Sequence, residues 1–157
     1  MRLFIWLIIF LISAGLGALV YVLLFQQKEQ PPDFQKVWGK PGHAVGELAN
    51  PAGVGVDQYG NVYVIDTGNN RVQKYSDDGT LVDTWGARGS KDTQFESPMR
   101  VAVLQDRLFV TDYSNGRVVC YDPKGSFLST FGQPGLDNGQ FHQPIGIGID
   151  PHGAVLV

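Results

Sequence analysis

The sequence predicts an all-β fold of the β-propeller class, built from four-stranded units that repeat about every 46 residues. An aromatic–glycine pair and a later proline each occur three times, at intervals of 47 and then 46 residues: Trp38, Trp85 and Phe131, then Pro51, Pro98 and Pro144. Within each period, short runs of β-branched and aromatic residues alternate with Gly, Asn and Asp. Such runs predict antiparallel strands joined by hairpins, and four strands per period of this length are typical of a propeller blade.

The first complete unit shows each expected element in order. Strands are predicted over 51–56, 61–66, 71–75 and 80–85, with turns between them. Gly60 and Gly79 lie in these turns, where glycine readily supplies a positive φ. The second unit follows the same plan, except that its first turn, near Asp106, is one residue shorter. Nothing in residues 34–157 sustains a helical period over three turns.

The repeat also sets the expected boundaries of the blades. Residues 34–39 form a lone outer strand, two blades cover 51–86 and 98–132, and an incomplete blade covers 144–157. Longer loops should carry the chain from the outer strand of one blade to the inner strand of the next. The inner strands 51–56 and 144–149 are small and rich in glycine, which suits strands that crowd around a central axis.

These units resemble the NHL repeat. The resemblance rests on Phe95-Glu-Ser-Pro98 and Phe141-His-Gln-Pro144, on Val56-Asp57 before Gly60-Asn61, and on Asp66 through Asn70-Arg71-Val72 with its second copy from Asp112 to Arg117-Val118. It covers residues 34–157. Two positions depart from the pattern: Leu48-Ala-Asn-Pro51 lacks the aromatic residue, and the turn near Asp106 is shortened.

The resemblance implies a six-bladed ring, of which about 2.5 blades are present, and in which an N-terminal strand such as 34–39 completes the last blade. The preferred interpretation is the front part of a longer or truncated protein. In the alternative, a naturally short form would have to oligomerise, because open strand edges and bare blade faces invite aggregation.

The N-terminal segment has a different composition. Residues 3–25 contain no charged side chain, and 23 residues span about 35 Å as a helix, enough to cross a bilayer. We therefore predict a transmembrane signal-anchor helix over 1–25 and a polar, proline-containing spacer over 26–33. A cleavable signal peptide is the alternative, but the small residues 13–18 lie in the middle of the apolar run. We expect the domain after this single-pass anchor to be extracytoplasmic.

Several polar and aromatic residues recur in each blade, and we interpret them as structural. A catalytic residue is needed once, whereas a residue present in every blade serves the blade. We expect the aspartates to accept backbone amide hydrogen bonds at the hairpin turn and the arginines to brace a neighbouring strand or carboxylate. These repeat positions are Asp66, Arg71, Asp112 and Arg117, together with the inter-blade packing residues Trp38, Trp85 and Phe131.

Candidate ligand-binding residues are therefore sought among the unrepeated positions near the inner strands. Arg100 is a single charge where the other units have Gly53 and Gly146, so it could meet an anionic ligand in the central funnel, or pair with a loop carboxylate. The residues after the three prolines, Ala52, Met99 and Ile145, are apolar. We identify no catalytic residues, no metal-ligand spacing among the three histidines and no cofactor motif. Cys120 is the only cysteine and suits a small buried apolar site.

The favoured function is a membrane-anchored scaffold that binds a protein, peptide or glycan through variable loops. The alternative is a propeller enzyme of the lyase or lactone-hydrolase type, with catalytic residues mainly in blades outside this sequence. A sensor region of a signalling protein is a third possibility. The net charge is −3 and no basic stripe occurs, so a nucleic-acid partner is not expected.

Overall fold

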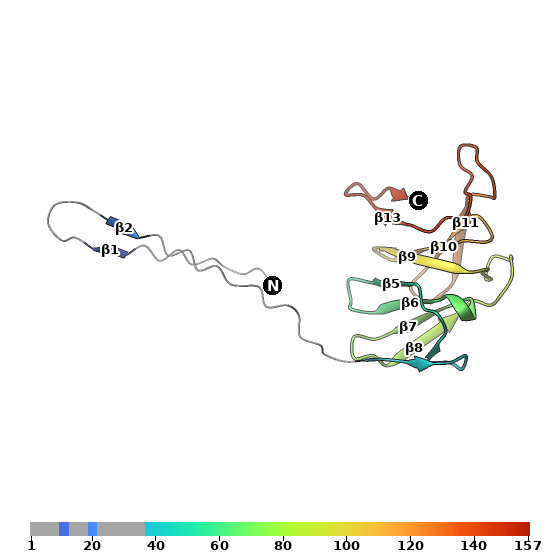
Figure 1. Ribbon diagram of the computed structural model, residues 1–157, viewed down its shortest axis with the longest axis horizontal. Coiled ribbons are helices and arrows are strands. Elements are labelled where there is room, and N and C mark those ends of the chain that lie inside the picture. The colour runs from blue at the N-terminus through green and yellow to red at the C-terminus, as the bar shows by residue number, and fades with distance from the viewer. Residues whose placement is uncertain (1–9, 13–18, 22–36) are drawn as a thin grey trace. The chain divides into compact units, whose positions relative to one another are not determined.

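The computed structural model describes residues 10–12, 19–21 and 37–157, and divides into two compact units, Met1–Lys36 and Val37–Val157 (Figure 1). The second unit is all-β apart from one short 3₁₀ turn, η1 (Thr67–Asn69). It contains two four-stranded antiparallel sheets and two short two-stranded sheets. The predicted all-β architecture of four-stranded repeating units is therefore confirmed.

The first four-stranded sheet follows the chain in simple order. Its strands are β5 (Gly53–Val56), β6 (Val62–Asp66), β7 (Arg71–Tyr75) and β8 (Leu81–Trp85). Each strand pairs with the next along the chain, so the sheet is an up-and-down meander. The connecting turns lie at the glycines and asparagines predicted from the sequence: Gly60 and Gly79 adopt φ of 84° and 86°, and Asn70 adopts φ of 53°.

The second four-stranded sheet repeats the first. Its strands are β9 (Pro98–Leu104), β10 (Arg107–Asp112), β11 (Arg117–Tyr121) and β12 (Phe127–Phe131). β9 and β10 are joined by the shortened turn, where Gln105 has a φ of 52°. Strands β13 (Gly148–Ile149) and β14 (Val155–Leu156) form the start of a third sheet, so the inner strand predicted over 144–149 is regular only in its last two residues.

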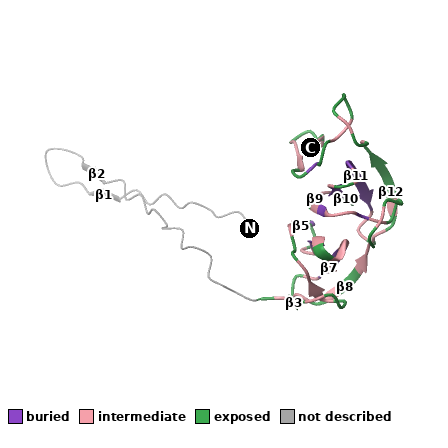
Figure 2. Cartoon of the chain, turned by 45° about the vertical axis from the view of Figure 1, so that its right-hand side comes forward, coloured by how far each residue is buried: buried purple, intermediate pink, exposed green. Residues whose placement is uncertain are grey.

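The sheets stack through their inner strands, β5 against β9 and β9 against β13 (Figure 1). One core lies between the first two sheets and includes Tyr63, Ile65, Leu108 and Tyr121, each with no exposed surface. A smaller core, around Phe109 and Cys120, lies between the second sheet and β13–β14. Figure 2 shows buried residues in the middle sheet and more exposed ones on the sheets to either side of it.

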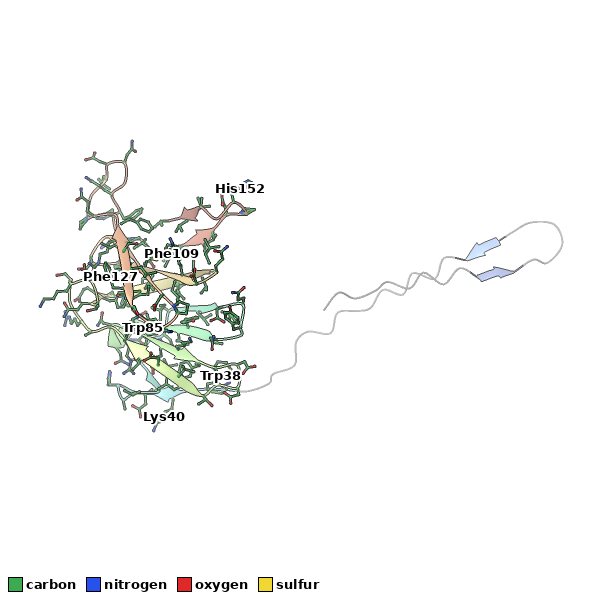
Figure 3. All side chains as sticks on the ribbon, turned by 180° about the vertical axis from the view of Figure 1, so that it is seen from behind. Trp38, Lys40, Trp85, Phe109, Phe127 and His152 are labelled. Carbon is green, nitrogen blue, oxygen red and sulfur yellow. The ribbon has the colours of Figure 1, made fainter. Side chains whose placement is uncertain are left out.

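The repeated tryptophans join one unit to the next (Figure 3). Trp85, at the end of β8, has its ring 6.1 Å from that of Tyr121 in the second sheet and 6.3 Å from that of Tyr63 in its own. Trp38 lies in the same relation to Tyr75, at 6.1 Å. A Cβ added to Gly79 would lie 2.7 Å from the Trp38 ring, and one added to Gly125 would lie 2.7 Å from the Trp85 ring. Each indole therefore packs against a turn glycine, where a side chain would clash with it.

The described part of the N-terminal unit differs from the helix predicted over 1–25. Strands β1 (Phe10–Ile12) and β2 (Leu19–Tyr21) pair antiparallel, with Phe10 opposite Tyr21. Among the described residues, no helix is long and apolar enough to cross a membrane. Apolar runs rich in Ile, Val and aromatic residues fit a strand as well as a helix, which is why periodicity alone did not distinguish them. The rest of that segment, and the spacer 26–33, lie outside the described residues.

Candidate binding surface

Three loops, each leading into the first strand of a sheet, share one backbone frame, and we call them the frame loops: 40–50, 87–97 and 133–143. In each loop a glycine amide donates to the carbonyl six residues later, from Gly42, Gly89 and Gly135 to Leu48, Phe95 and Phe141, at 2.9–3.3 Å. The start of each loop also pairs in parallel with the end of the same loop. In the first loop this pairing forms β3 (Lys40–Pro41) and β4 (Glu47–Leu48), and in the other two it is a single bridge, Arg88 with Phe95 and Pro134 with Phe141.

A repeated side chain closes the tip of each frame loop. The amides of Glu47, Gln94 and Gln140 each donate to the carbonyl three residues earlier, at 2.9–3.0 Å. In return, the side-chain oxygen of each residue accepts the amide of that earlier residue, at 3.0–3.2 Å. This reciprocal pair of bonds needs an acceptor on a side chain of Glu or Gln length, and it fixes the tip turn in all three loops.

Each frame loop ends in a left-handed residue just before its proline. Asn50, Ser97 and Gln143 have φ of 47°, 58° and 58°. A non-glycine residue in this region costs about 1–3 kcal/mol and persists only where its surroundings impose it. The same unusual conformation at three equivalent positions indicates that the frame, rather than the residue type, dictates the backbone.

The first frame loop is held by a buried ion pair in the first sheet. Asp66, with no exposed surface, accepts from Arg71 Nε at 2.7 Å and from the Ala49 amide at 2.7 Å. Arg71 Nη2 then donates to the carbonyls of Ala44 and Glu47, both at 2.7 Å. The aspartate therefore binds a loop amide 17 residues earlier in the chain, and the arginine bridges that aspartate to the loop backbone.

The second sheet holds its own frame loop in the same way. Asp112 accepts from Arg117 Nε at 2.9 Å and from the Glu96 amide at 2.8 Å. Arg117 Nη2 donates to the carbonyls of Lys91 and Gln94, at 2.8 and 2.9 Å. The pair thus serves the loop that precedes its blade. The aspartates were predicted to accept amide hydrogen bonds at the hairpin turn, whereas the amides that they bind, those of Ala49 and Glu96, belong to the preceding loop.

Sequence reasoning missed the amide side chains that complete these anchors. Asn69 and Asn115 each donate, at 2.8 Å, to the aspartate oxygen Oδ2 that also accepts from the arginine. They also donate to a loop carbonyl, Gly42 at 3.1 Å and Gly89 at 2.9 Å. Their recurrence at an interval of 46 residues was the available signal. The buried Gln73 adds bonds to the first loop that Val119, its counterpart, cannot make.

On this constant frame the tip side chains differ. The tips are His43-Ala44-Val45, Ser90-Lys91-Asp92 and Leu136-Asp137-Asn138, and all nine residues are exposed. Val45 is 64% exposed and Leu136 is 88% exposed, so two of the three tips offer an apolar side chain to solvent. His43 is held by a 2.6 Å bond between its Nδ1 and Asn69 Oδ1. One scaffold therefore presents three chemically distinct tips at the same end of the sheets.

Of the four candidate residues, Met99 and Arg100 lie on β9, whereas Ala52 lies just before β5 and Ile145 lies in the segment that leads to β13. Arg100 is exposed, and its Nη1 donates to the carbonyls of Ala52 and Met99. Thr111 Oγ1 joins the second and third units, within hydrogen-bond distance of the carbonyls of Arg100 and Ile145. No carboxylate among the described residues pairs with Arg100, so its charge is met by backbone oxygens instead of the loop carboxylate considered above.

The described residues contain no group of three or more His, Cys, Asp or Glu side chains that could hold a metal ion. His43, in a loop tip, and His152, in the β13–β14 turn, lie at opposite ends of the strands. Cys120 is buried, and its burial raises the pKa of the thiol. No catalytic constellation is therefore visible in this part of the chain, and the frame loops are its most distinctive surface.

Stacked four-stranded antiparallel sheets with repeated frame loops define a repeat protein of the propeller type. Residues 48–75 match the family model described as NHL repeat. The protein brain tumor of Drosophila melanogaster is 32% identical over 91 residues, and the protein lin-41 of Caenorhabditis elegans is 49% identical over 45 residues. These matches cover 58% and 29% of this chain. The chain therefore contains an NHL repeat over residues 48–75.

These similarities are partial in length. The chain spans 9% of the brain tumor protein and 4% of lin-41. Among solved structures, virginiamycin B lyase from Staphylococcus aureus superposes with a TM-score of 0.50 at 19% identity, covering 67% of this chain and 33% of that one. At this identity the likeness concerns the fold alone, and it supports the propeller-type arrangement.

Proposed function

We propose that this NHL-repeat segment is a binding module whose frame-loop tips form the recognition surface for a protein partner. The observation that supports this most directly is the contrast within the loops. The same pattern of backbone hydrogen bonds fixes all three loops, and a buried Asp–Arg pair anchors each of the first two, whereas the three tips carry unrelated exposed residues. A rigid frame with adaptable tips reduces the ordering cost of binding and leaves specificity to the tips.

The mixture of side chains on the tips favours a protein partner. Leu136 and Val45 supply apolar contact area, and Lys91, Asp92 and Asp137 supply both signs of charge around it. Protein interfaces combine apolar contacts with a polar rim in this way, whereas a nucleic-acid site needs a concentration of positive charge. The described surface offers no such concentration.

Site-specific photo-crosslinking in cells tests this proposal. A photoreactive amino acid would be placed at Leu136, on a loop tip, and separately at Tyr59, which is 77% exposed but lies in the β5–β6 turn at the opposite end of the strands. We expect a discrete protein adduct from position 136 that is absent from position 59. Equal adducts from both positions, or none from either, would contradict a recognition surface at the tips.

We also propose that residues 3–25 attach the chain to a membrane and that the propeller segment lies outside the cytoplasm. The support is the uncharged composition of these 23 residues. Extraction of isolated membranes at alkaline pH should leave the full chain with the membranes, whereas a chain that begins at residue 34 should be released. In intact cells, protease added outside should cut the propeller segment while a cytoplasmic marker protein stays intact. Release of the full chain, or protection of the propeller segment, would contradict the proposal.

The enzymatic alternative, a lyase or lactone hydrolase, gains no support from the described residues. The inner-strand side chains of Ala52, Met99 and Ile145 are apolar, and Arg100 is bonded to backbone carbonyls. The lyase neighbour agrees with the fold only. The binding function is therefore the one that the visible geometry favours.

A further inference from the structure

The sequence contains two Asn–Gly pairs, Asn115–Gly116 and Asn138–Gly139, and the fold treats them in opposite ways. Asparagine is a chemically labile residue, because a backbone nitrogen can attack its side-chain amide. The reaction is easiest when glycine follows, since glycine has no Cβ to hinder the approach and leaves the backbone free to adopt the conformation that ring formation requires. The surroundings of each pair therefore decide whether it reacts in the folded chain.

The first pair is held on both sides of the bond that would have to form. Asn115 Nδ2 donates to Asp112 Oδ2 at 2.8 Å and to the Gly89 carbonyl at 2.9 Å. Gly116 is buried, and its amide donates to the Tyr113 carbonyl at 3.4 Å. A Cβ built on this glycine would lie 2.9 Å from backbone atoms of the third frame loop. The anchor of the second frame loop thus fixes the asparagine, and the third frame loop covers the glycine.

The second pair is free of such contacts. It lies at the tip of the third frame loop, and both of its residues are exposed. Neither the Asn138 side chain nor the Gly139 amide takes part in a hydrogen bond within the described chain. No described atom lies within 4 Å of a Cβ built on Gly139, whose φ is 79°. The space in which a ring would form beside this glycine is therefore open.

The exposure of the second pair is a property of its position in the frame loop. Its counterparts in the second frame loop are Asp92 and Thr93, and both are exposed although the complete sheet β9–β12 follows that loop. In the first frame loop, the counterpart of Asn138 is Val45, which is 64% exposed and is also followed by a complete sheet. A complete third sheet would therefore leave Asn138 accessible in the same way.

We propose that the folded chain modifies itself at Asn138–Gly139 by loss of ammonia, while Asn115–Gly116 stays intact. The Gly139 nitrogen loses its proton and bonds to Cγ of Asn138, the Cγ–Nδ2 bond breaks, and the side-chain nitrogen leaves as ammonia. The five-membered succinimide that results takes up one water molecule. Opening at Cγ gives aspartate, opening at the backbone carbonyl gives isoaspartate, and nothing is oxidised or reduced.

The products alter the tip in charge and in backbone length. Either acid adds a negative charge next to Asp137, and isoaspartate also inserts a methylene group into the main chain. That insertion falls inside the tip turn, which the Gln140 amide closes on the Asp137 carbonyl at 3.0 Å. An effect of the modification on partner binding would rest on the function proposed above, whereas the modification itself does not.

Timed incubation of the full chain in a mild non-ionic detergent tests the proposal, with peptide mapping by mass spectrometry to measure conversion at each asparagine. Methylation by an isoaspartate-specific carboxyl methyltransferase detects the isoaspartate product separately. Circular dichroism verifies that the chain stays folded, and a parallel sample in urea gives the rates without the fold. The variant Asn138→Gln, at an exposed position, is the control, because its longer side chain would have to close a larger ring.

In the folded chain we expect Asn138 to convert at least about tenfold faster than Asn115, whereas in urea the two should convert at similar rates. The rate at Asn138 should rise from neutral to mildly alkaline pH, because the Gly139 nitrogen must lose its proton. Asn138→Gln should lower the methylation of the folded chain several-fold. Equal rates at the two asparagines in the folded chain, or conversion of Asn138 only in urea, would overturn the proposal.

Discussion

At the scale of single residues, the most consequential groups are the buried aspartates that bind the frame loops. Asp112 has no exposed surface, and its two oxygens accept from Arg117, Asn115 and the Glu96 amide. A carboxylate buried in this way is tolerated because several donors replace the water it has lost. Removing it leaves the charge of Arg117 and a loop amide unmatched.

We therefore expect Asp112→Ala to lower the free energy of unfolding by about 3–5 kcal/mol, because it removes one partner of a buried ion pair and leaves the charge of Arg117 without a counter-ion. Urea unfolding at neutral pH, followed by tryptophan fluorescence, measures this loss. Arg88→Ala is the matched control, because the Arg88–Glu96 pair is exposed and should contribute less than about 1 kcal/mol. Equal losses from the two variants would contradict the role given to Asp112.

Asp57 makes a second residue-scale prediction, on pH. Its burial tends to raise the pKa, but hydrogen bonds from the Asn61 side chain, the Tyr63 hydroxyl and two backbone amides outweigh burial, and the pKa is lowered. A lowered pKa in the folded state means that the carboxylate stabilises the fold at pH values above its unfolded pKa of about 3.9. That stability is lost as the pH falls through the lower, folded pKa.

Asp57→Asn should therefore be less stable than wild type near pH 6, and the difference in unfolding free energy should shrink as the pH falls below about 4. Urea denaturation at a series of pH values gives the difference directly. Asp77→Asn, at an exposed turn residue, controls for a general charge effect. A difference for Asp57→Asn that is constant down to pH 3 would show that the ionised carboxylate is not the stabilising form.

At the scale of elements, the glycines of β5 determine how closely two sheets approach. Gly55→Val would place its side chain against Val101 and Val103, so we expect a loss of about 1–3 kcal/mol from overpacking. Gly148→Val occupies the equivalent position in β13, where no described atom lies within 4 Å, and should leave the stability nearly unchanged. Thermal unfolding of dilute samples compares the two. A smaller loss for Gly55→Val than for Gly148→Val would contradict the stacking.

The strands were predictable because their signals are local. Alternating apolar residues and turn glycines gave β5 to β8 to within two residues at either end. The partners of Asp66 were not predictable in the same way, because the Ala49 amide is remote in sequence and depends on the path of the loop. The apolar run 3–25 was ambiguous for a related reason, since its composition fits both a helix and the strands β1 and β2.

At the scale of the whole propeller segment, stability and recognition are separated in space. The cores and Asp–Arg anchors lie within and between the sheets, and the tips meet the anchors through backbone groups, except for the bond between the His43 side chain and Asn69. Arg117, for example, binds the carbonyl of Lys91 and not its side chain. Changes to tip side chains should therefore affect binding without affecting folding, which is the property that a recognition scaffold requires.

The double change Val45→Asp and Leu136→Asp tests this separation. Both side chains are exposed, so the free energy of unfolding should stay within about 0.5 kcal/mol of wild type. Affinity for the partner identified by crosslinking should fall at least about tenfold, which corresponds to about 1.4 kcal/mol, because charges replace apolar contact area. Val82→Asp with Leu128→Asp, at exposed apolar residues on the outer strands β8 and β12, is the matched control and should leave affinity unchanged. If both double variants bind like wild type, the frame-loop tips are not the recognition surface. If the tip variant unfolds more easily instead, the tips belong to the scaffold.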